Sequence, residues 1–159
     1  MPAQVKAKAD KAKAPYAKAE TPYAKAKAKA VKAIGVVPNF GGRRCDTSVG
    51  PSSVQAWGLW DCDPEDASGR APTQQHGYGR SFPWHFDMLE KAYVLEGSAT
   101  LTPDDAALHG PPVTIAAGDM VTFPKGWRGR WEVHAFLNKR YAFFDGKGIR
   151  VDEHIDEVE

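Results

Sequence analysis

No apolar stretch of this 159-residue chain approaches the roughly 18 residues that a membrane-spanning helix needs. The N-terminal segment also lacks the hydrophobic core of a secretory signal, so we expect an intracellular protein that is not secreted. Residues 1–34 contain no arginine and no serine, which organelle transit peptides usually contain, although they share the low acid content of such peptides. A plastid or another organelle therefore remains an alternative compartment.

Cysteine is scarce as well, because the chain contains only Cys45 and Cys62. Two thiols do not make the disulfide framework of a small secreted domain, and a chain of this length can bury a core of its own. The cysteine content therefore indicates a reducing compartment with unpaired thiols, and a Cys45–Cys62 bridge is the minor alternative.

The chain has almost no net charge, at +1, but its charges are unevenly distributed. Residues 1–34 hold nine lysines against two acidic residues, a net charge of +7, and the rest of the chain carries −6. This asymmetry predicts a basic arm over residues 1–34 and a mildly acidic body. Residues 147–159 form an acidic C-terminal tail, which could neutralise part of the arm.

The basic arm consists largely of Lys-Ala dipeptides and repeats the segment Pro-Tyr-Ala-Lys-Ala at residues 15–19 and 22–26. Alanine and lysine favour a helix, but the prolines interrupt one, and an alternation of period two leaves a helix without an apolar face. We therefore expect an extended or partly helical arm that has no core. A solvated tail without a partner is one interpretation of such a segment.

The other interpretation is an electrostatic tether to an anionic surface. A large protein assembly, nucleic acid and an anionic membrane surface are all candidate partners, and nothing in the arm selects among them. The predicted contact residues are Lys6, Lys8, Lys11, Lys13, Tyr16, Lys18, Tyr23, Lys25, Lys27, Lys29 and Lys32.

Short candidate strands separated by turn residues fill the chain from residue 54 to residue 146. They cover residues 54–61, 82–87, 91–96, 98–102, 112–116, 119–123, 129–135 and 139–145, and we expect no helix among them. Regularly spaced short strands are typical of a β-sandwich or β-barrel, so the prediction is an all-β domain. Residues 35–53 are rich in glycine, proline, arginine and serine and are predicted to be a linker.

Two glycine-containing segments carry a resemblance to a known family. Residues 90–97 have the Glu-x6-Gly spacing of the first cupin motif, and residues 118–126 have the Gly-x5-Pro-x-Gly spacing of the second, with twenty residues between them. With Trp84-x-Phe86, Trp131-Glu132-Val133 and Lys139-Arg140-Tyr141, residues 54–144 resemble single-domain cupins similar to the barrel of ureidoglycine aminohydrolase. The resemblance implies a cupin jelly-roll barrel that is often a homodimer.

The resemblance also implies a divalent metal site. Cupin enzymes hold Mn, Ni, Fe or Zn through a His-x-His pair, a glutamate and a third histidine, and the glutamate position here is Glu90. The other positions carry residues without a ligating side chain; they are Trp84, Phe86, Gly129 and Val133. His85 fits a longer His-x4-Glu spacing, but side chains alternate along a strand, so it faces away from Glu90 unless a bulge intervenes. We therefore predict no metal, with Glu90 and His85 as ligands if one is bound.

Glu90 is then the ionisable group predicted inside the barrel, in a pocket with Trp84, Phe86, Trp131 and Val133. A carboxylate in apolar surroundings has a raised pKa unless it is paired, which makes Glu90 a candidate acid or base. The alternative, which we favour, is an ion pair that only stabilises the barrel. The candidate partners in this pair are Arg128, Arg130 and Arg140.

Tyr93 has the opposite parity to Glu90, so it could pack outside the barrel. Residues 63–81 form a long polar loop where such barrels usually have a short turn. Loops of this length are usually functional or disordered, and this one could be a lid over the barrel or a docking loop, with Tyr78 and Arg80 as anchors.

Three functions remain open. The missing ligands, the charge asymmetry and the long loop favour a non-catalytic cupin that serves as a structural or adaptor subunit, tethered to a larger assembly by its arm. The first alternative is a small-molecule enzyme similar to ureidoglycine aminohydrolase, with or without a divalent metal. The second is a protein that binds a small ligand in an aromatic-lined barrel without chemistry. Fold alone does not decide among them.

Overall fold

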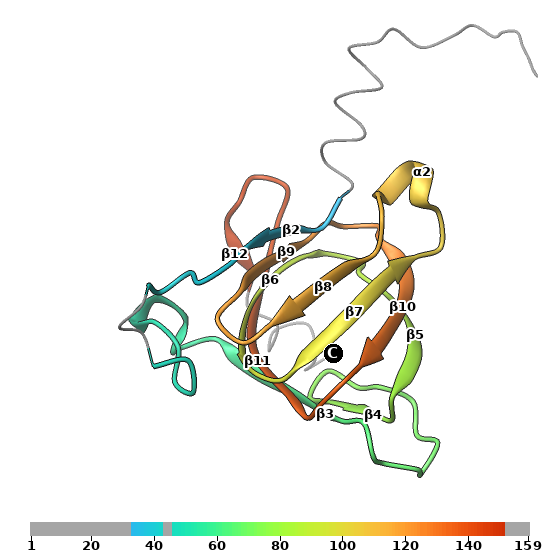
Figure 1. Ribbon diagram of the computed structural model, residues 1–159. Coiled ribbons are helices and arrows are strands. Elements are labelled where there is room, and N and C mark those ends of the chain that lie inside the picture. The colour runs from blue at the N-terminus through green and yellow to red at the C-terminus, as the bar shows by residue number, and fades with distance from the viewer. Residues whose placement is uncertain (1–32, 43–45, 152–159) are drawn as a thin grey trace, which may run out of the picture. The chain divides into compact units, whose positions relative to one another are not determined.

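Two β-sheets face each other in the computed structural model, which describes residues 33–42 and 46–151 (Figure 1). Within these ranges eleven strands are present, and the predicted all-β jelly-roll barrel is confirmed. The larger sheet has the order β2 (Gly35–Val37), β9 (Met120–Phe123), β6 (Leu89–Glu96), β11 (Leu137–Phe144), β3 (Gly58–Asp63) and β4 (His76–Tyr78), with β12 (Arg150–Val151) paired to β11. The smaller sheet has the order β5 (Ser81–His85), β10 (Arg128–Val133), β7 (Ser98–Pro103) and β8 (Val113–Ala116).

The core lies between the two sheets because alternate residues of each strand face inward. In β10, Gly129, Trp131 and Val133 are buried, whereas Arg128, Arg130 and Glu132 are exposed. The larger sheet contributes inward residues such as Val94, Phe123 and Tyr141 to the same cluster. This period of two is the geometry of a β-strand, in which successive side chains point to opposite faces.

A second apolar cluster lies on the outer face of β6, where Tyr93 and Leu95 pack with Val54. The segment from residue 46 to residue 57 covers this face, and it contains a short 3-10 helix at Ser52–Val54. Tyr93 is therefore fully buried although it points away from the barrel interior. Strand β6 is buried on both faces from Ala92 to Leu95, which explains the unbroken apolar run of these four residues.

Three local predictions differ from the structure. Gly35–Val37, placed in the predicted linker, forms β2 and pairs antiparallel with β9. The first strand of the predicted series begins at Gly58 rather than at residue 54. A single helical turn, α2 (Ala106–His109), stands where no helix was expected, because the Asp105 carboxylate accepts hydrogen bonds from two backbone amides of that turn.

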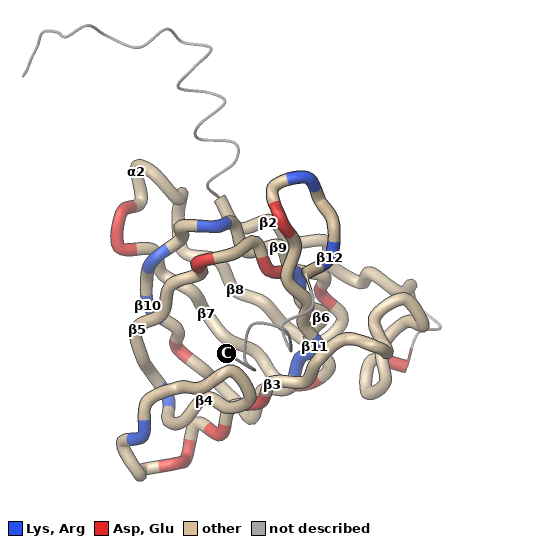
Figure 2. Tube along the Cα trace, turned by 180° about the vertical axis from the view of Figure 1, so that it is seen from behind, with Lys and Arg blue, Asp and Glu red and all other residues tan. Residues whose placement is uncertain are grey.

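The long loop over residues 63–81 contains strand β4, which pairs in parallel with β3. A parallel neighbour requires a crossover connection rather than a tight turn, which accounts for the length of the loop. Gly77 allows β4 to approach, because a Cβ there would lie 2.6 Å from the Trp60 ring. Acidic residues gather along β3 and the loop, as Figure 2 shows; they are Asp61, Asp63, Glu65 and Asp66.

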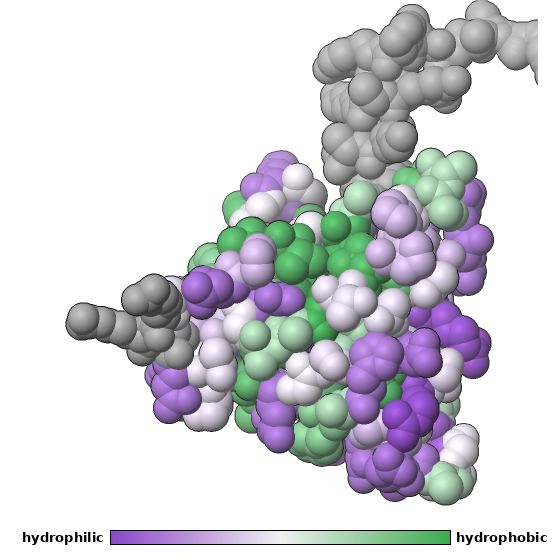
Figure 3. Space-filling view, viewed as in Figure 1, coloured by the Kyte–Doolittle hydropathy of each residue, from purple (hydrophilic) through white to green (hydrophobic). Residues whose placement is uncertain are grey.

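Apolar side chains also reach the surface on the face that carries β2 and β8 (Figure 3). Val37 is 54% exposed there, and Val36 and Val113 are only partly buried. The homodimer expected from the resemblance stays a prediction. Within residues 33–42 and 46–151, no helix has the length and apolar character to cross a bilayer.

Candidate functional site

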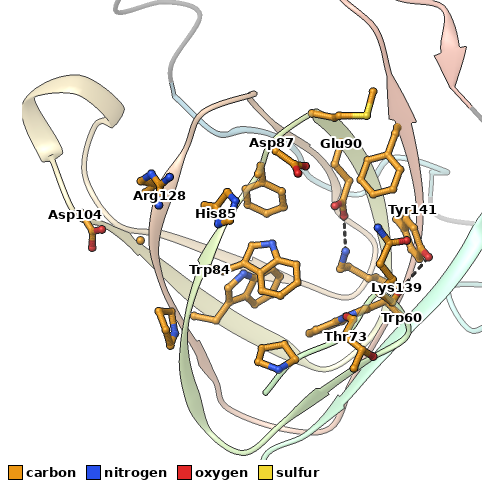
Figure 4. A pocket seen from close by; sticks show the side chains of 18 residues that line it. Trp60, Thr73, Trp84, His85, Asp87, Glu90, Asp104, Arg128, Lys139 and Tyr141 are labelled. Atoms are coloured by element: carbon orange, nitrogen blue, oxygen red, sulfur yellow. Dashed lines mark hydrogen bonds and ion pairs between the residues drawn. The ribbon is translucent and has the colours of Figure 1, made fainter. Parts of the chain in front are cut away.

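A cavity of about 450 Å³ opens between the two sheets (Figure 4). Its walls come from β3, β5, β6, β10 and β11, together with the loop over residues 63–81. Aromatic side chains dominate the lining; they are Trp60, Trp84, Phe86, Trp131, Tyr141 and Phe143. This size and composition are typical of a site for a small organic ligand.

Glu90 and Lys139 form a buried ion pair in the cavity. Figure 4 shows the two side chains pointing toward each other from β6 and β11, and Lys139 Nζ donates a hydrogen bond to Glu90 Oε2. The side chains are only 5% (Lys139) and 6% (Glu90) exposed. The prediction of an ion pair with Arg128, Arg130 or Arg140 is therefore corrected, because the cation that pairs with Glu90 is Lys139.

Those arginines lie elsewhere. Arg128 lines the cavity, and its strand places Arg130 on the exposed face, where Nε donates to Ser81 Oγ at 2.9 Å. Arg140 points to the outer face of β11, where Nη1 donates to the carbonyl oxygen of Trp57 at 3.1 Å. The parity of β11 could have indicated Lys139, since it alternates with Arg140 and shares its face with buried Tyr141.

Four aromatic rings surround the ammonium group of Lys139. The distances from Nζ to the ring centroids are 5.1 Å for Trp60, 5.2 Å for Tyr141, 5.6 Å for Phe123 and 6.0 Å for Trp131. We call these four residues the aromatic cage. Such cages attract cations through the quadrupole of each ring, and here the cage already holds a cation of the protein itself. A cationic ligand in the cavity would meet the positive charge of Lys139.

The residues present do not fit a divalent metal. Glu90 forms an ion pair with Lys139, whose ammonium group lies beside the aromatic cage, and His85 is exposed at the cavity wall. At Gly129, where the family would place a histidine, a Cβ would lie 2.3 Å from the carbonyl oxygen of Thr102 and 2.4 Å from the Trp127 ring. Among the described residues no three His, Cys, Asp or Glu side chains gather where they could hold a metal ion.

The long loop supplies one wall of the cavity through Pro72, Thr73 and Gln74. Two side chains from the barrel interior hold it there. Trp60 Nε1 donates to the carbonyl oxygen of Thr73 at 3.0 Å, and the Tyr141 hydroxyl donates to the carbonyl oxygen of Gln74 at 3.0 Å. Residues 72–74 therefore cover part of the cavity in the manner of a lid.

The two residues proposed as loop anchors make contacts within the loop. Arg80 Nη2 donates to Glu65 Oε2 at 2.8 Å, and the Tyr78 ring lies 4.1 Å below the guanidinium of Arg70. These contacts hold the two ends of the loop together. Nothing in them identifies a docking partner.

Of the predicted pocket residues, Trp84, Phe86 and Trp131 line the cavity, whereas Val133 is buried in the core outside it. Trp131 is only 2% exposed, and its Nε1 is buried with no hydrogen-bond partner among the described residues. Sequence reasoning missed Lys139, Trp60 and the loop residues 72–74. Strand parity alone could have placed Lys139 and Trp60 on the inner face of their strands. No local pattern in the sequence indicates that residues 72–74 line the cavity.

Cys62 is a buried free thiol on β3, and Cys45 lies outside the described residues. Burial, with a smaller contribution from Asp61 and other nearby carboxylates, raises the pKa of Cys62 to about 12. The thiol is thus protonated at neutral pH and is not a nucleophile there. The predicted contact residues of the basic arm, within residues 1–32, also lie outside the described residues.

Comparison with known proteins identifies relatives of this chain. Residues 68–141 match the model of the EutQ-like cupin domain family. A DUF861 family protein from Thermotoga maritima is 34% identical; the match covers 58% of this chain and 83% of that protein, with a TM-score of 0.45. A search of curated proteins found no match.

Two further solved structures are more distant. The EutQ protein of Clostridium difficile is 24% identical, over 38% of this chain and 44% of that protein, with a TM-score of 0.33. A DUF861 family protein of unknown function from Pseudomonas syringae pv. tomato is 22% identical, over 39% of this chain and 25% of that protein, with a TM-score of 0.34. Because these matches cover less than half of either relative, the functions of those proteins do not transfer to this chain.

Proposed function

We propose that this chain, which belongs to the EutQ-like cupin domain family, binds a small organic molecule in the cavity of its barrel. The observation that carries this proposal is an aromatic-lined cavity of about 450 Å³ that contains a neutralised Lys139–Glu90 pair. The family membership confirms the cupin resemblance seen in the sequence. The narrower likeness to ureidoglycine aminohydrolase stays a prediction.

The charges of the cavity favour an uncharged ligand. Lys139 and Glu90 cancel each other in the buried part, where a further charge of either sign would lose its hydration without gaining a counter-ion. The remaining ionisable residues of the wall also include both signs; they are His85, Asp87, Asp104 and Arg128. Aromatic walls supply the apolar contact, so shape and stacking would contribute most of the affinity.

A metal-dependent hydrolase has less support. Its expected histidine positions carry Trp84, Phe86 and Gly129, and Lys139 holds the carboxylate that would complete a ligand set. Catalysis without a metal would need Glu90 or Lys139 to exchange a proton with a substrate, which their mutual ion pair opposes. Binding without chemistry is therefore the function proposed.

Blocking the cavity should abolish binding. We expect uncharged aromatic fragments to bind the natural protein and quench its tryptophan fluorescence, and we expect Gln74→Trp to weaken this binding about ten-fold or more by filling the cavity with an indole. The hydrogen bond from Tyr141 to residue 74 uses the backbone carbonyl, so the substitution retains it. Titration by fluorescence and by ligand-observed NMR measures the change.

Gln75→Trp is the matched control, because Gln75 is the exposed neighbour whose side chain does not line the cavity. It should bind the fragments as the natural protein does. Equal affinities of the two variants, or no fragment binding by the natural protein, would contradict the proposal.

The role of a tethered adaptor subunit is a separate proposal that concerns the basic arm. Its support is the charge asymmetry, with +7 on residues 1–34 and −6 on the rest of the chain. Deleting residues 1–34 should remove partners that co-purify at low salt and should eliminate salt-sensitive retention on a polyanion column. Unchanged partners and unchanged retention would show that the arm is not a tether.

A further inference from the structure

We infer that the ligand of the cavity is an uncharged, planar aromatic compound and that Trp84 is the residue on which its ring stacks. The inference rests on the proposed function and deepens it, because it names the class of the ligand and the residue that selects it. It comes from the contrast between the rings that the fold stacks on one another and the ring that it leaves without a stacked neighbour.

Buried aromatic rings of the barrel interior stack in pairs. The rings of Phe86 and Phe123 are nearly parallel, with an interplanar angle of 10° and centroids 4.4 Å apart. The rings of Phe82 and Trp131 are also stacked, at 17° and 6.1 Å. All four side chains are buried, so each of these rings already has a parallel neighbour within the chain.

Trp84 lines the cavity but has no such neighbour. Its ring contacts are with Phe82 and Phe86, and both are close to perpendicular, at 78° and 73°. No aromatic ring among the residues that the structure describes lies parallel to the Trp84 indole. The side chain is half-buried, and Figure 4 shows the indole projecting from β5 into the cavity. Trp84 therefore presents to the cavity a large ring that the fold does not stack.

The other aromatic residues of the cavity wall are less suited to this role. Trp60 and Tyr141 are buried, and their ring centroids lie 5.1 and 5.2 Å from Lys139 Nζ, so these rings already surround a cation. Phe143 is half-buried on β11, and its ring is inclined by 63° to that of Tyr141. Of the two half-buried rings in the wall, Trp84 is the larger.

An exposed indole face selects a flat, conjugated ligand. Aromatic rings that stack with an offset gain an attraction beyond the burial of apolar area, and a saturated ring of the same size does not gain it. A planar ring needs no charge for this contact, which agrees with the mutual neutralisation of Lys139 and Glu90 in the cavity. The volume of about 450 Å³ accommodates such a ring beside the indole.

The test compares two uncharged probes, 2-naphthol and decahydro-2-naphthol, by calorimetric titration of the full-length protein. The probes share one carbon skeleton and one hydroxyl group, but only the first is planar and aromatic. We expect the natural protein to bind 2-naphthol about five-fold more tightly. Trp84→Leu keeps an apolar side chain but removes the flat ring. It should weaken 2-naphthol about five-fold and change decahydro-2-naphthol less than about two-fold.

Trp57→Leu is the matched control. Trp57 is also a half-buried tryptophan, and its ring contact with Phe144 is nearly perpendicular, at 70°. It packs with the apolar cluster on the outer face of β6 and does not line the cavity. This variant should bind both probes as the natural protein does, and a loss of 2-naphthol binding equal to that of Trp84→Leu overturns the assignment to Trp84.

The outcomes separate this inference from the proposed function. If the natural protein binds both probes equally, or if Trp84→Leu weakens both alike, the planar ligand class is overturned while the ligand-binding cavity stands. If neither probe binds the natural protein, both are overturned. Should Trp84→Leu not fold, nuclear Overhauser effects in the natural protein give the answer. We expect them between 2-naphthol and the Trp84 indole protons, and their absence overturns the inference.

Discussion

Replacing Lys139 by methionine should lower the free energy of unfolding by about 3–5 kcal/mol. The substitution removes the cation that pairs with the buried Glu90 carboxylate, so the ion pair no longer offsets the desolvation of that charge. Methionine has a similar length and packs well against aromatic rings, so the loss should reflect the charge rather than a cavity. Urea unfolding at neutral pH, followed by tryptophan fluorescence, measures it.

Two further variants identify the cause. Lys91→Met removes an exposed lysine next to Glu90 in the sequence, and it should cost less than about 1 kcal/mol because exposed charges contribute little. The double variant Glu90→Met/Lys139→Met replaces both charges by apolar groups and should recover most of the stability lost by Lys139→Met. A double variant as unstable as the sum of the two single variants would show that the charges do not act as a pair.

Gly129→Ala should destabilise the barrel by about 3 kcal/mol, at the upper end for an overpacked core. The added methyl group would lie 2.3 Å from the carbonyl oxygen of Thr102 and 2.4 Å from the Trp127 ring, and neither the β7 backbone nor a fully buried indole can move freely. The same measurement shows whether a side chain of any kind can occupy the position where the family would place a metal ligand.

Gly35→Ala is the control for this substitution. Gly35 is also a strand glycine, but the nearest atom to its added methyl group is Thr122 Cβ at 3.9 Å, an ordinary contact. We expect its unfolding free energy to stay within about 0.5 kcal/mol of the natural protein, as for most surface substitutions. Equal losses at Gly35 and Gly129 would mean that the contacts around Gly129 are not the cause.

Local patterns in the sequence were sufficient for most of the barrel strands, although not for β2, β4 and β12, and for the direction of their side chains. The period of two places Phe82, Trp84 and Phe86 on the inner side, with His85 exposed between them. It also places Glu90 and Tyr93 on opposite faces of β6, and in the structure Tyr93 is buried in the apolar cluster on the outer face. These features depend only on the geometry of one strand, so a single chain segment contains the information.

Contacts between distant segments could not be predicted in the same way. The partner of Glu90 depends on the register of β11 against β6, which contains a shift between Asn138 and Lys139. A one-residue change in register turns every side chain to the opposite face. Strand parity indicates which residues of β11 face the barrel interior, but it does not say which of them lies beside Glu90 on another strand. Arginines were therefore proposed where the structure has Lys139.

The cavity is the clearest example of what only tertiary structure decided. The sequence by itself determined that the histidines of the cupin motif are missing, because the residue type at each motif position can be seen in the sequence without a structure. Only the fold shows what replaced them: an ion pair from two strands, an aromatic cage, and a loop wall held by Trp60 and Tyr141. Hydrogen bonds and ion pairs between segments up to 67 residues apart build this site, and they exist only once the sheets have closed.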